Sequence, residues 1–152
     1  MKKSAPDLSW YFETLSAFDD ARLTSHYSLP ASSFSMQGPR PRNEDRTFVL
    51  WSGRRHDRPP MLAAGLLDGI GGSKVGDVAA SVAAAHFLAA FVENQRPIEA
   101  APELQDVLES ALTRANAQLC EIFDGASGTT LTAVAMTHEC CVAVHVGDSR
   151  LY

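Results

Sequence analysis

The sequence lacks the features that mark several large classes of protein. Positive charge is not in excess, because 13 lysines and arginines face 18 aspartates and glutamates and the net charge is -5. A basic surface for nucleic acid or for an anionic membrane is therefore not expected. The most apolar segment, residues 78–92, contains His86 and is too short to span a bilayer. Lys2 and Lys3 are not followed by an apolar stretch, so the sequence predicts no signal peptide.

Cysteine and histidine are also sparse. The three cysteines, Cys120, Cys140 and Cys141, are odd in number and show no CxxC spacing, which disfavours a disulfide framework and a zinc site. Reduced thiols in a cytoplasmic protein fit this pattern best. The five histidines show no metal-ligand spacing. We interpret His86, on an apolar helix, and His145, on an apolar strand, as ordinary residues with satisfied hydrogen bonds.

What is present is the composition of one globular domain, with 152 residues, 45% hydrophobic and 20% charged. Residues 1–30 are predicted to be an N-terminal extension and residues 31–152 the domain. The extension has apolar residues at helical spacing and is expected to form a short helix that either packs on the domain or binds a partner. These residues are Leu8, Tyr11, Phe12, Leu15 and Phe18.

Four strands and two helices are predicted within the domain. Strands are expected at residues 47–51, 61–67, 129–137 and 140–146, the last two joined as a hairpin. Between the second and third strands, one helix is expected at 75–94, with Ser73 as its cap, and another after Pro102. The second helix shows the clearest spacing of apolar residues, in steps of three and four. This order predicts an α+β domain, with an antiparallel sheet and the helices segregated from it.

The most informative stretch follows the second strand, where Asp68 is succeeded by Gly69-Ile70-Gly71-Gly72. Taken alone, an Asp-Gly pair is a common signal for a hairpin turn. Two glycine-rich nucleotide motifs do not fit, because Lys74 replaces the last glycine of GxGxxG and no Gly-Lys-Ser/Thr follows for a P-loop. A turn and a site for a small charged ligand remain as the two interpretations.

Acidic residues lie next to strand ends at three places. These are Glu44 and Asp45, Asp68, and Asp148. Clustered carboxylates stay ionised together only with a cation between them, and an all-oxygen ligand set favours Mg²⁺ or Mn²⁺. Neighbours on a regular strand face opposite sides, so we expect one of Glu44 and Asp45 to bind metal directly and the other through water. Gly69 has no side chain, so its carbonyl can approach an ion closely.

A basic, proline-rich turn precedes the acidic pair. Within it, Arg40 offers a planar guanidinium group for a phosphate. The alternative is that Arg40 and Arg42 belong to a solvated basic loop.

Several of these motifs, in this order, resemble the metal-dependent serine/threonine protein phosphatases of the PP2C (PPM) type. The resemblance covers residues 33–152 and rests on four segments. They are Ser35-Met36-Gln37-Gly38-x-Arg40-x-x-Asn43-Glu44-Asp45, Asp68-Gly69-Ile70-Gly71-Gly72 with Gly76-Asp77-x-Ala79-Ala80, Ser127-Gly128-Thr129-Thr130, and Gly147-Asp148-Ser149-Arg150.

The resemblance implies a β-sandwich of antiparallel sheets flanked by helices, with two Mn²⁺ or Mg²⁺ ions at one end. Asp68 would bridge the ions, Gly69 would give its carbonyl, Glu44 would bind one ion, and Asp45 would hold metal-bound water. Arg40 would grip the substrate phosphate, so that Arg40, Asp45 and Asp68 are the catalytic residues. Asp148 resembles the ligand of a third, weaker metal. The bridging water would attack phosphoserine or phosphothreonine directly.

Two departures from the family pattern qualify this expectation. Ile70 stands where some eukaryotic members have a histidine proposed as general acid, so water would protonate the leaving group; an apolar residue there is common in bacterial members. The family's catalytic domain also continues beyond the segment around Asp148, so the chain is expected to be the N-terminal part of that domain and catalytically incomplete by itself.

An opposing serine/threonine kinase is expected as a partner from the family alone. A non-catalytic regulatory or phosphoprotein-binding module, and a structural interaction domain that docks through residues 1–30, remain as alternatives.

Overall fold

The computed structural model describes residues 33–52, 61–72, 75–93, 98 and 100–152. The helix predicted within residues 1–30 and the helix cap predicted at Ser73 lie outside these residues. The division into residues 1–30 and 31–152 therefore stays a prediction.

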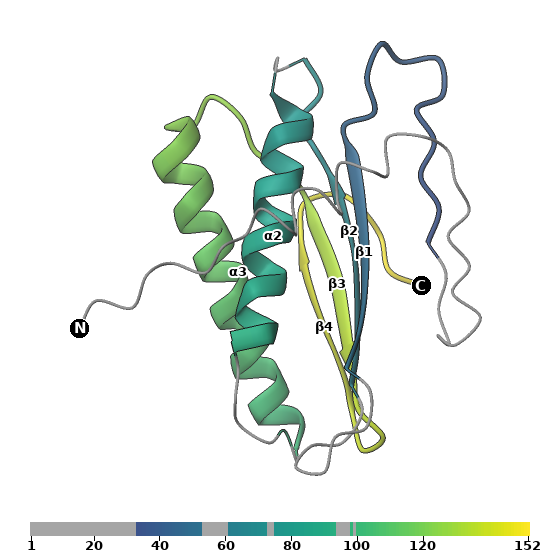
Figure 1. Cartoon of the computed structure of the whole chain (residues 1–152), viewed down its shortest axis with the longest axis vertical. Coiled ribbons are helices and arrows are strands. Elements are labelled where there is room, and N and C mark those ends of the chain that lie inside the picture. Colours follow the sequence, from purple (N-terminus) through teal and green to yellow (C-terminus); the bar gives the residue numbers. More distant parts are fainter. Residues whose placement is uncertain (1–32, 53–60, 73–74, 94–97, 99) are drawn as a thin grey trace.

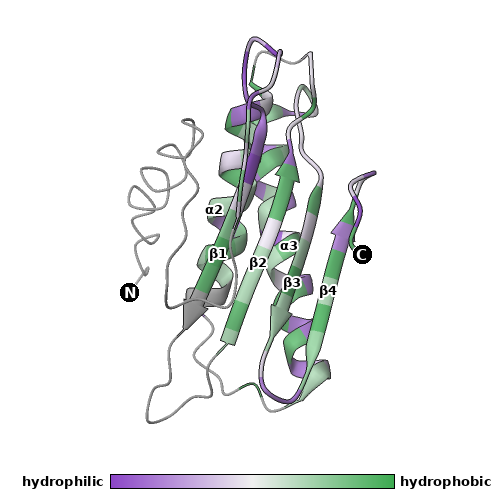
Figure 2. Ribbon diagram, turned by 90° about the vertical axis from the view of Figure 1, so that its right-hand side faces the viewer, coloured by the Kyte–Doolittle hydropathy of each residue, from purple (hydrophilic) through white to green (hydrophobic). Residues whose placement is uncertain are grey.

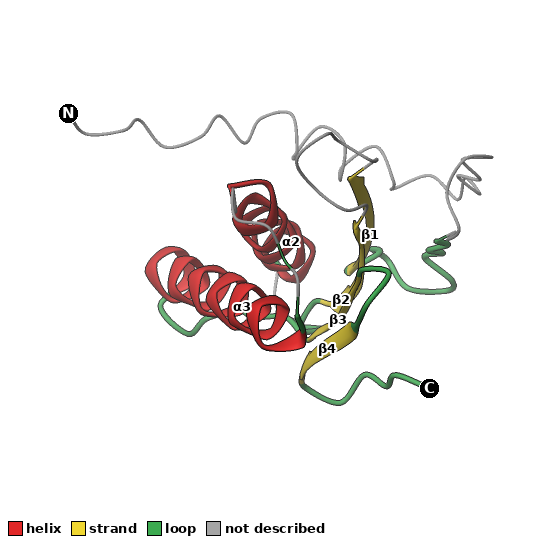
Figure 3. Cartoon of the chain, turned by 90° about the horizontal axis from the view of Figure 1, so that it is seen from below, coloured by secondary structure: helices red, strands yellow, loops and turns green. Residues whose placement is uncertain are grey.

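The described elements follow the predicted order of two strands, two helices and two strands (Figure 1). They form one antiparallel sheet in the order β1-β2-β3-β4, and both helices lie on the same side of it (Figure 3). The prediction of an α+β domain with segregated helices is confirmed. The bounds are β1 Asp45–Ser52, β2 Met61–Asp68, α2 Gly76–Glu93, α3 Ala101–Phe123, β3 Leu131–Met136 and β4 Cys141–Val146.

Two strand boundaries differ from the prediction by two residues, and no other differs by more than one. β1 begins at Asp45 rather than at residue 47, because Asp45 pairs with Asp68 at the end of β2. β3 begins at Leu131 rather than at residue 129, since Thr129 makes only an isolated bridge to Gly69. Both differences lie at the same end of the sheet, where pairing depends on contacts between segments distant in sequence.

Small residues bring α2 close to the sheet. Its alanines at positions 79, 80, 83, 84 and 85 are almost fully buried, so the backbone of the helix can approach the strands. The Phe48 ring of β1 meets Phe87 of α2 with centroids 5.6 Å apart. Gly65 on β2 leaves room for the Phe48 ring, because an added Cβ would overlap its Cζ and Cε1 atoms. Helix α2 is therefore buried against the sheet.

The amphipathic helix α3 covers α2 and β4. Its predicted apolar stripe is the side that is buried, with Leu104, Leu108, Ala111 and Ala115 in the core. The same spacing of three and four includes Ile122 near the end of the helix, but this side chain is 53% exposed. The helix stops at Asp124, which adopts a φ of 46° and donates its N–H to the Cys120 carbonyl, a common way for a helix to end.

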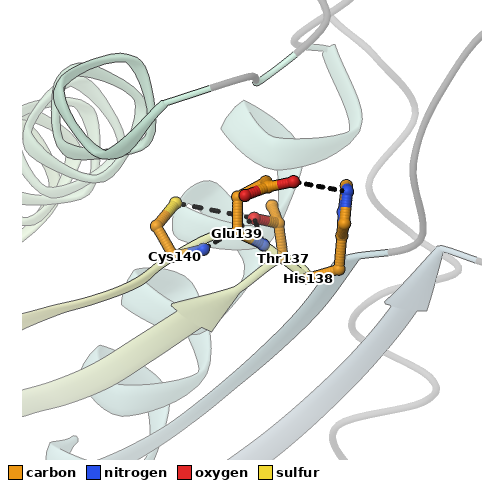
Figure 4. Close-up of polar contacts among 4 residues, drawn as sticks. All are labelled: Thr137, His138, Glu139 and Cys140. Carbon is orange, nitrogen blue, oxygen red and sulfur yellow. Dashed lines mark hydrogen bonds and ion pairs between the residues drawn. The ribbon is translucent and has the colours of Figure 1, made fainter.

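The hairpin between β3 and β4 turns at His138 and Glu139, as predicted (Figure 4). Neither residue has a positive φ, so this is not the type I′ turn that such a short connection usually adopts. The Thr137 hydroxyl supports the turn instead by accepting the N–H groups of Glu139 and Cys140, each at 3.2 Å. The ion pair between His138 and Glu139 lies on the surface, where it adds little stability.

The strands of the sheet are apolar over much of their length (Figure 2), and some of these residues lie on the face away from the helices. Leu66 and Met136 point to this face and are 44% and 40% exposed. A groove of about 370 Å³ runs over it, lined among others by Thr47, Leu66 and Val134. The described residues contain one sheet, so the second sheet of the expected sandwich stays a prediction. None of the described helices is long and apolar enough to cross a membrane.

Replacing Gly65 by alanine tests the contact between the sheet and the Phe48 ring. We expect Gly65→Ala to lower the free energy of unfolding by about 1–3 kcal/mol, because the added Cβ overpacks the ring. The same change in a Phe48→Leu background should cost less, since the ring is gone. Chemical denaturation of the four proteins measures the coupling, and an equal cost in both backgrounds would show that the ring is not the obstacle.

Candidate metal centre

The centre of the candidate site is a pair of aspartates opposite one another on neighbouring strands. Asp45, the first residue of β1, is the register partner of Asp68, the last residue of β2, so both side chains lie on the same face of the sheet. Burial raises the pKa of Asp45, and the charge of Asp68 and a hydrogen bond with it raise that pKa further. Arg46 and Arg40 act in the opposite direction by lowering the pKa of Asp45. Asp45 therefore binds a proton more readily than an isolated carboxylate would, and a cation beside it would relieve the repulsion from Asp68.

The backbone of Asp68 is held by the residues that lead into β3. Its N–H donates to the Thr130 hydroxyl at 3.0 Å. Its carbonyl accepts the Thr130 N–H at 2.9 Å and the Thr129 hydroxyl at 3.0 Å. These bonds fix the peptide groups on both sides of Asp68. They also give Thr129 and Thr130 a structural role, although β3 begins only at Leu131.

Gly69 lies where three backbone segments meet. Its N–H donates to the Glu44 carbonyl at 3.1 Å, and an added Cβ would lie 2.9 Å from that oxygen and 2.6 Å from the carbonyl carbon of Gly76. Gly76, which begins α2, is equally confined, because a Cβ there would lie 2.8 Å from the Ile70 carbonyl oxygen. The chain thus passes from β2 into α2, so Asp68-Gly69 does not form a hairpin turn.

Glu44 and Arg40 lie against the same glycine turn. A Cβ added to Gly71 would lie 3.5 Å from both Arg40 Nη1 and Glu44 Oε2, and one added to Gly76 would lie 3.0 Å from Glu44 Oε1. Glu44 precedes β1, so strand alternation does not force its side chain away from that of Asp45. The structure therefore gathers Arg40, Glu44, Asp45, Asp68 and Gly69 at one end of the sheet.

Arg46 contributes to this arrangement and was not predicted. It is 6% exposed, and its Nη1 donates to the carbonyls of Asn43 and Asp45 at 2.9 and 2.8 Å, on either side of Glu44. Its Nε donates to the Ser81 hydroxyl of α2 at 2.9 Å. Arg46 thereby fixes the irregular backbone around the acidic pair to the helix. The available signal was a charged residue at a helix-facing position of an otherwise apolar strand.

Asp148 is connected to the other predicted ligands through its neighbour Ser149. It is exposed in the turn after β4, and the link to Asp68 is indirect. The neighbouring Ser149 hydroxyl lies 3.0 Å from the Thr130 hydroxyl, which accepts the Asp68 N–H. Asp148 therefore belongs to the same end of the sheet through its neighbour.

The chemistry of the donors fits a hard divalent cation. Glu44, Asp45 and Asp68 offer carboxylates, Gly69 offers a carbonyl, and the repulsion between Asp45 and Asp68 is what a cation would relieve. Their arrangement is less complete, because the described residues contain no group of three or more histidine, cysteine, aspartate or glutamate side chains placed to hold a metal ion. The described residues thus supply the carboxylate pair of Asp45 and Asp68 and suitable neighbouring oxygens, but not a complete set of metal ligands.

The comparison with known families agrees with the sequence motifs. Residues 41–152 match the model of the protein phosphatase 2C family. This match covers more than half of the chain, so the chain belongs to the protein phosphatase 2C family. Comparisons with curated proteins and with solved structures gave no match.

The raised pKa of Asp45 predicts how stability depends on pH. The folded chain binds the proton of Asp45 more tightly than the unfolded chain does, so the free energy of unfolding falls as pH rises from the ordinary pKa of 3.8 through the raised one. Asp45→Asn should therefore stabilise the metal-free chain at pH 7, by less than about 1 kcal/mol because the site is partly solvated.

Denaturation at several pH values measures this effect. Asp106→Asn, on the exposed side of α3, is the matched control and should leave the pH profile unchanged. If Asp45→Asn destabilised the metal-free chain at pH 7, the favourable contacts of the Asp45 carboxylate would outweigh its burial and its repulsion by Asp68, contrary to this prediction.

Proposed function

We propose that this chain forms part of a metal-dependent protein phosphatase that hydrolyses phosphoserine or phosphothreonine. The observation that carries the proposal is the register of Asp45 opposite Asp68, because it places together two carboxylates whose mutual repulsion a bound cation would relieve. Membership in the protein phosphatase 2C family supports a phosphatase activity, and the site residues support the finer assignment.

The metal-binding residues in this proposal are Glu44, Asp45, Asp68 and the Gly69 carbonyl, with Asp148 as a ligand for a further ion. Bound Mn²⁺ or Mg²⁺ would lower the pKa of water and neutralise charge on the phosphoryl group. Asp68 would be shared between the two ions, and three hydrogen bonds to its backbone keep the residue in place. Asp45 would orient water at the site.

Arg40 is the proposed phosphate-binding residue. Its guanidinium lies beside Gly71 and the Glu44 carboxylate and is exposed to solvent, so an incoming phosphate can reach it. A planar guanidinium can donate two parallel hydrogen bonds to phosphate oxygens. Ile70, which is 55% exposed next to this turn, has no proton to donate, so the leaving alcohol would take its proton from solvent.

A non-catalytic phosphoprotein-binding module is the second candidate. The incomplete ligand set among the described residues favours it, since a site with Arg40 and a weakly held cation can bind a phosphate without hydrolysing it. The two candidates differ in whether phosphate is released from a bound phosphopeptide.

Asp68→Asn tests the proposed function. In the full-length protein, we expect this change to lower Mn²⁺-dependent phosphate release from a phosphothreonine peptide by at least about 100-fold, because it removes the shared ligand charge. Asp106→Asn is the control and should retain activity. A thermal melt checks that Asp68→Asn still folds. Activity that survived in Asp68→Asn would contradict the mechanism. Peptide binding without release of phosphate by the unmodified protein would favour the binding module.

A further inference from the structure

His145 of β4 makes two hydrogen bonds, one to the neighbouring strand β3 and one to the turn that carries Asp148. It is the cross-strand partner of Thr132, and its Nδ1 lies 2.8 Å from the Thr132 hydroxyl oxygen. Its Nε2 lies 2.9 Å from the Gly147 carbonyl oxygen. One imidazole ring therefore joins a neighbouring strand to the residue just before Asp148.

The partners of the ring decide which nitrogen carries the proton. A carbonyl oxygen only accepts hydrogen bonds, so Nε2 must hold the proton that it donates to Gly147. In the neutral ring Nδ1 is then an acceptor, and the Thr132 hydroxyl donates to it. Thr132 is 6% exposed, so its hydroxyl is expected to have a partner within the protein, and His145 supplies one.

The turn is held at its other side by Thr130. Gly147 adopts a φ of 108° and passes so close to Thr130 that an added Cβ would lie 2.6 Å from Thr130 Cγ2. Ser149, directly after Asp148, lies within hydrogen-bonding distance of the Thr130 hydroxyl. Asp148 is therefore flanked by two fixed points, the carbonyl of Gly147 and the hydroxyl of Ser149. The Ser149 link leads through Thr130 to the N–H of Asp68.

We propose that His145 is a positioning residue, which as the Nε2–H tautomer fixes the Gly147 carbonyl and so holds Asp148 at the end of the sheet where Asp68 lies. The role of Asp148 as a ligand for a metal ion rests on the proposed function. The tautomer and the order of the turn do not, because they follow from contacts within the metal-free chain. His145 acts through the backbone and touches neither substrate nor metal.

The first experiment examines the metal-free protein by NMR. We expect the ring nitrogens of His145 to show a protonated Nε2 and an unprotonated Nδ1. We also expect the amides of Gly147, Asp148 and Ser149 to have heteronuclear NOE values as high as those of β4. His145→Leu should lower these NOE values, and His145→Gln, which keeps a donor near the Nε2 position, should restore them. His138→Leu, at the opposite end of the same hairpin, is the control and should change nothing near Asp148.

The second experiment titrates Mn²⁺ into the same variants of the full-length protein, followed by electron paramagnetic resonance. His145→Leu should raise the dissociation constant of the most weakly bound ion about tenfold, as expected when a residue that orients a ligand is lost. His145→Gln should stay within about threefold of the unmodified protein.

The two experiments separate the possible failures. A ring that carries its proton on Nδ1 alone, or a turn that keeps its NOE values in His145→Leu, overturns the positioning role whatever the metal result. Equal Mn²⁺ affinity in His145→Leu and the unmodified protein overturns the link to the metal. An unmodified protein that binds no Mn²⁺ contradicts the proposed function, while the NMR result still decides whether His145 holds the turn.

Discussion

The arrangement of the site depends on the register between β1 and β2, which sets Asp45 directly opposite Asp68. A slip of one residue would turn one of these carboxylates to the helix side. Two contacts secure the register: the Phe48 ring occupies the space above Gly65, and the Gly69 N–H bonds to the Glu44 carbonyl. The register between β1 and β2 therefore determines both the packing of Phe48 in the core and the position of the acidic pair.

Close backbone approach is the second requirement of this end of the sheet. Gly69 and Gly76 allow the segment before β1, the end of β2 and the start of α2 to meet without side chains between them, while the buried Arg46 binds carbonyls of the first segment and the Ser81 hydroxyl of the helix. This rigid support holds Asp45 in a position that disfavours ionisation of its carboxyl and raises its pKa. Such a cost in stability is common where a protein is built to bind a cation.

The sequence predicted the element order well, because apolar spacing distinguishes the strands from the helices and the sheet follows from their order. It also predicted that the acidic residues stand next to strand ends. The start of β3, the inward role of Arg46 and the contacts of His145 depend on cross-strand neighbours that no local pattern contains. The second sheet and the domain boundary at residue 31 remain predictions, since the described residues neither contain the one nor test the other.

The central claim is that Asp45 and Asp68 form a cation site with Glu44 and the Gly69 carbonyl. Its most direct test is X-ray diffraction from crystals grown with Mn²⁺, with data collected on both sides of the manganese absorption edge. We expect an anomalous difference peak within ligand distance of both the Asp45 and the Asp68 carboxylates, and no such peak in crystals of Asp68→Asn. A well-ordered Asp45–Asp68 pair without manganese at saturating Mn²⁺, or manganese bound only elsewhere, would contradict the claim.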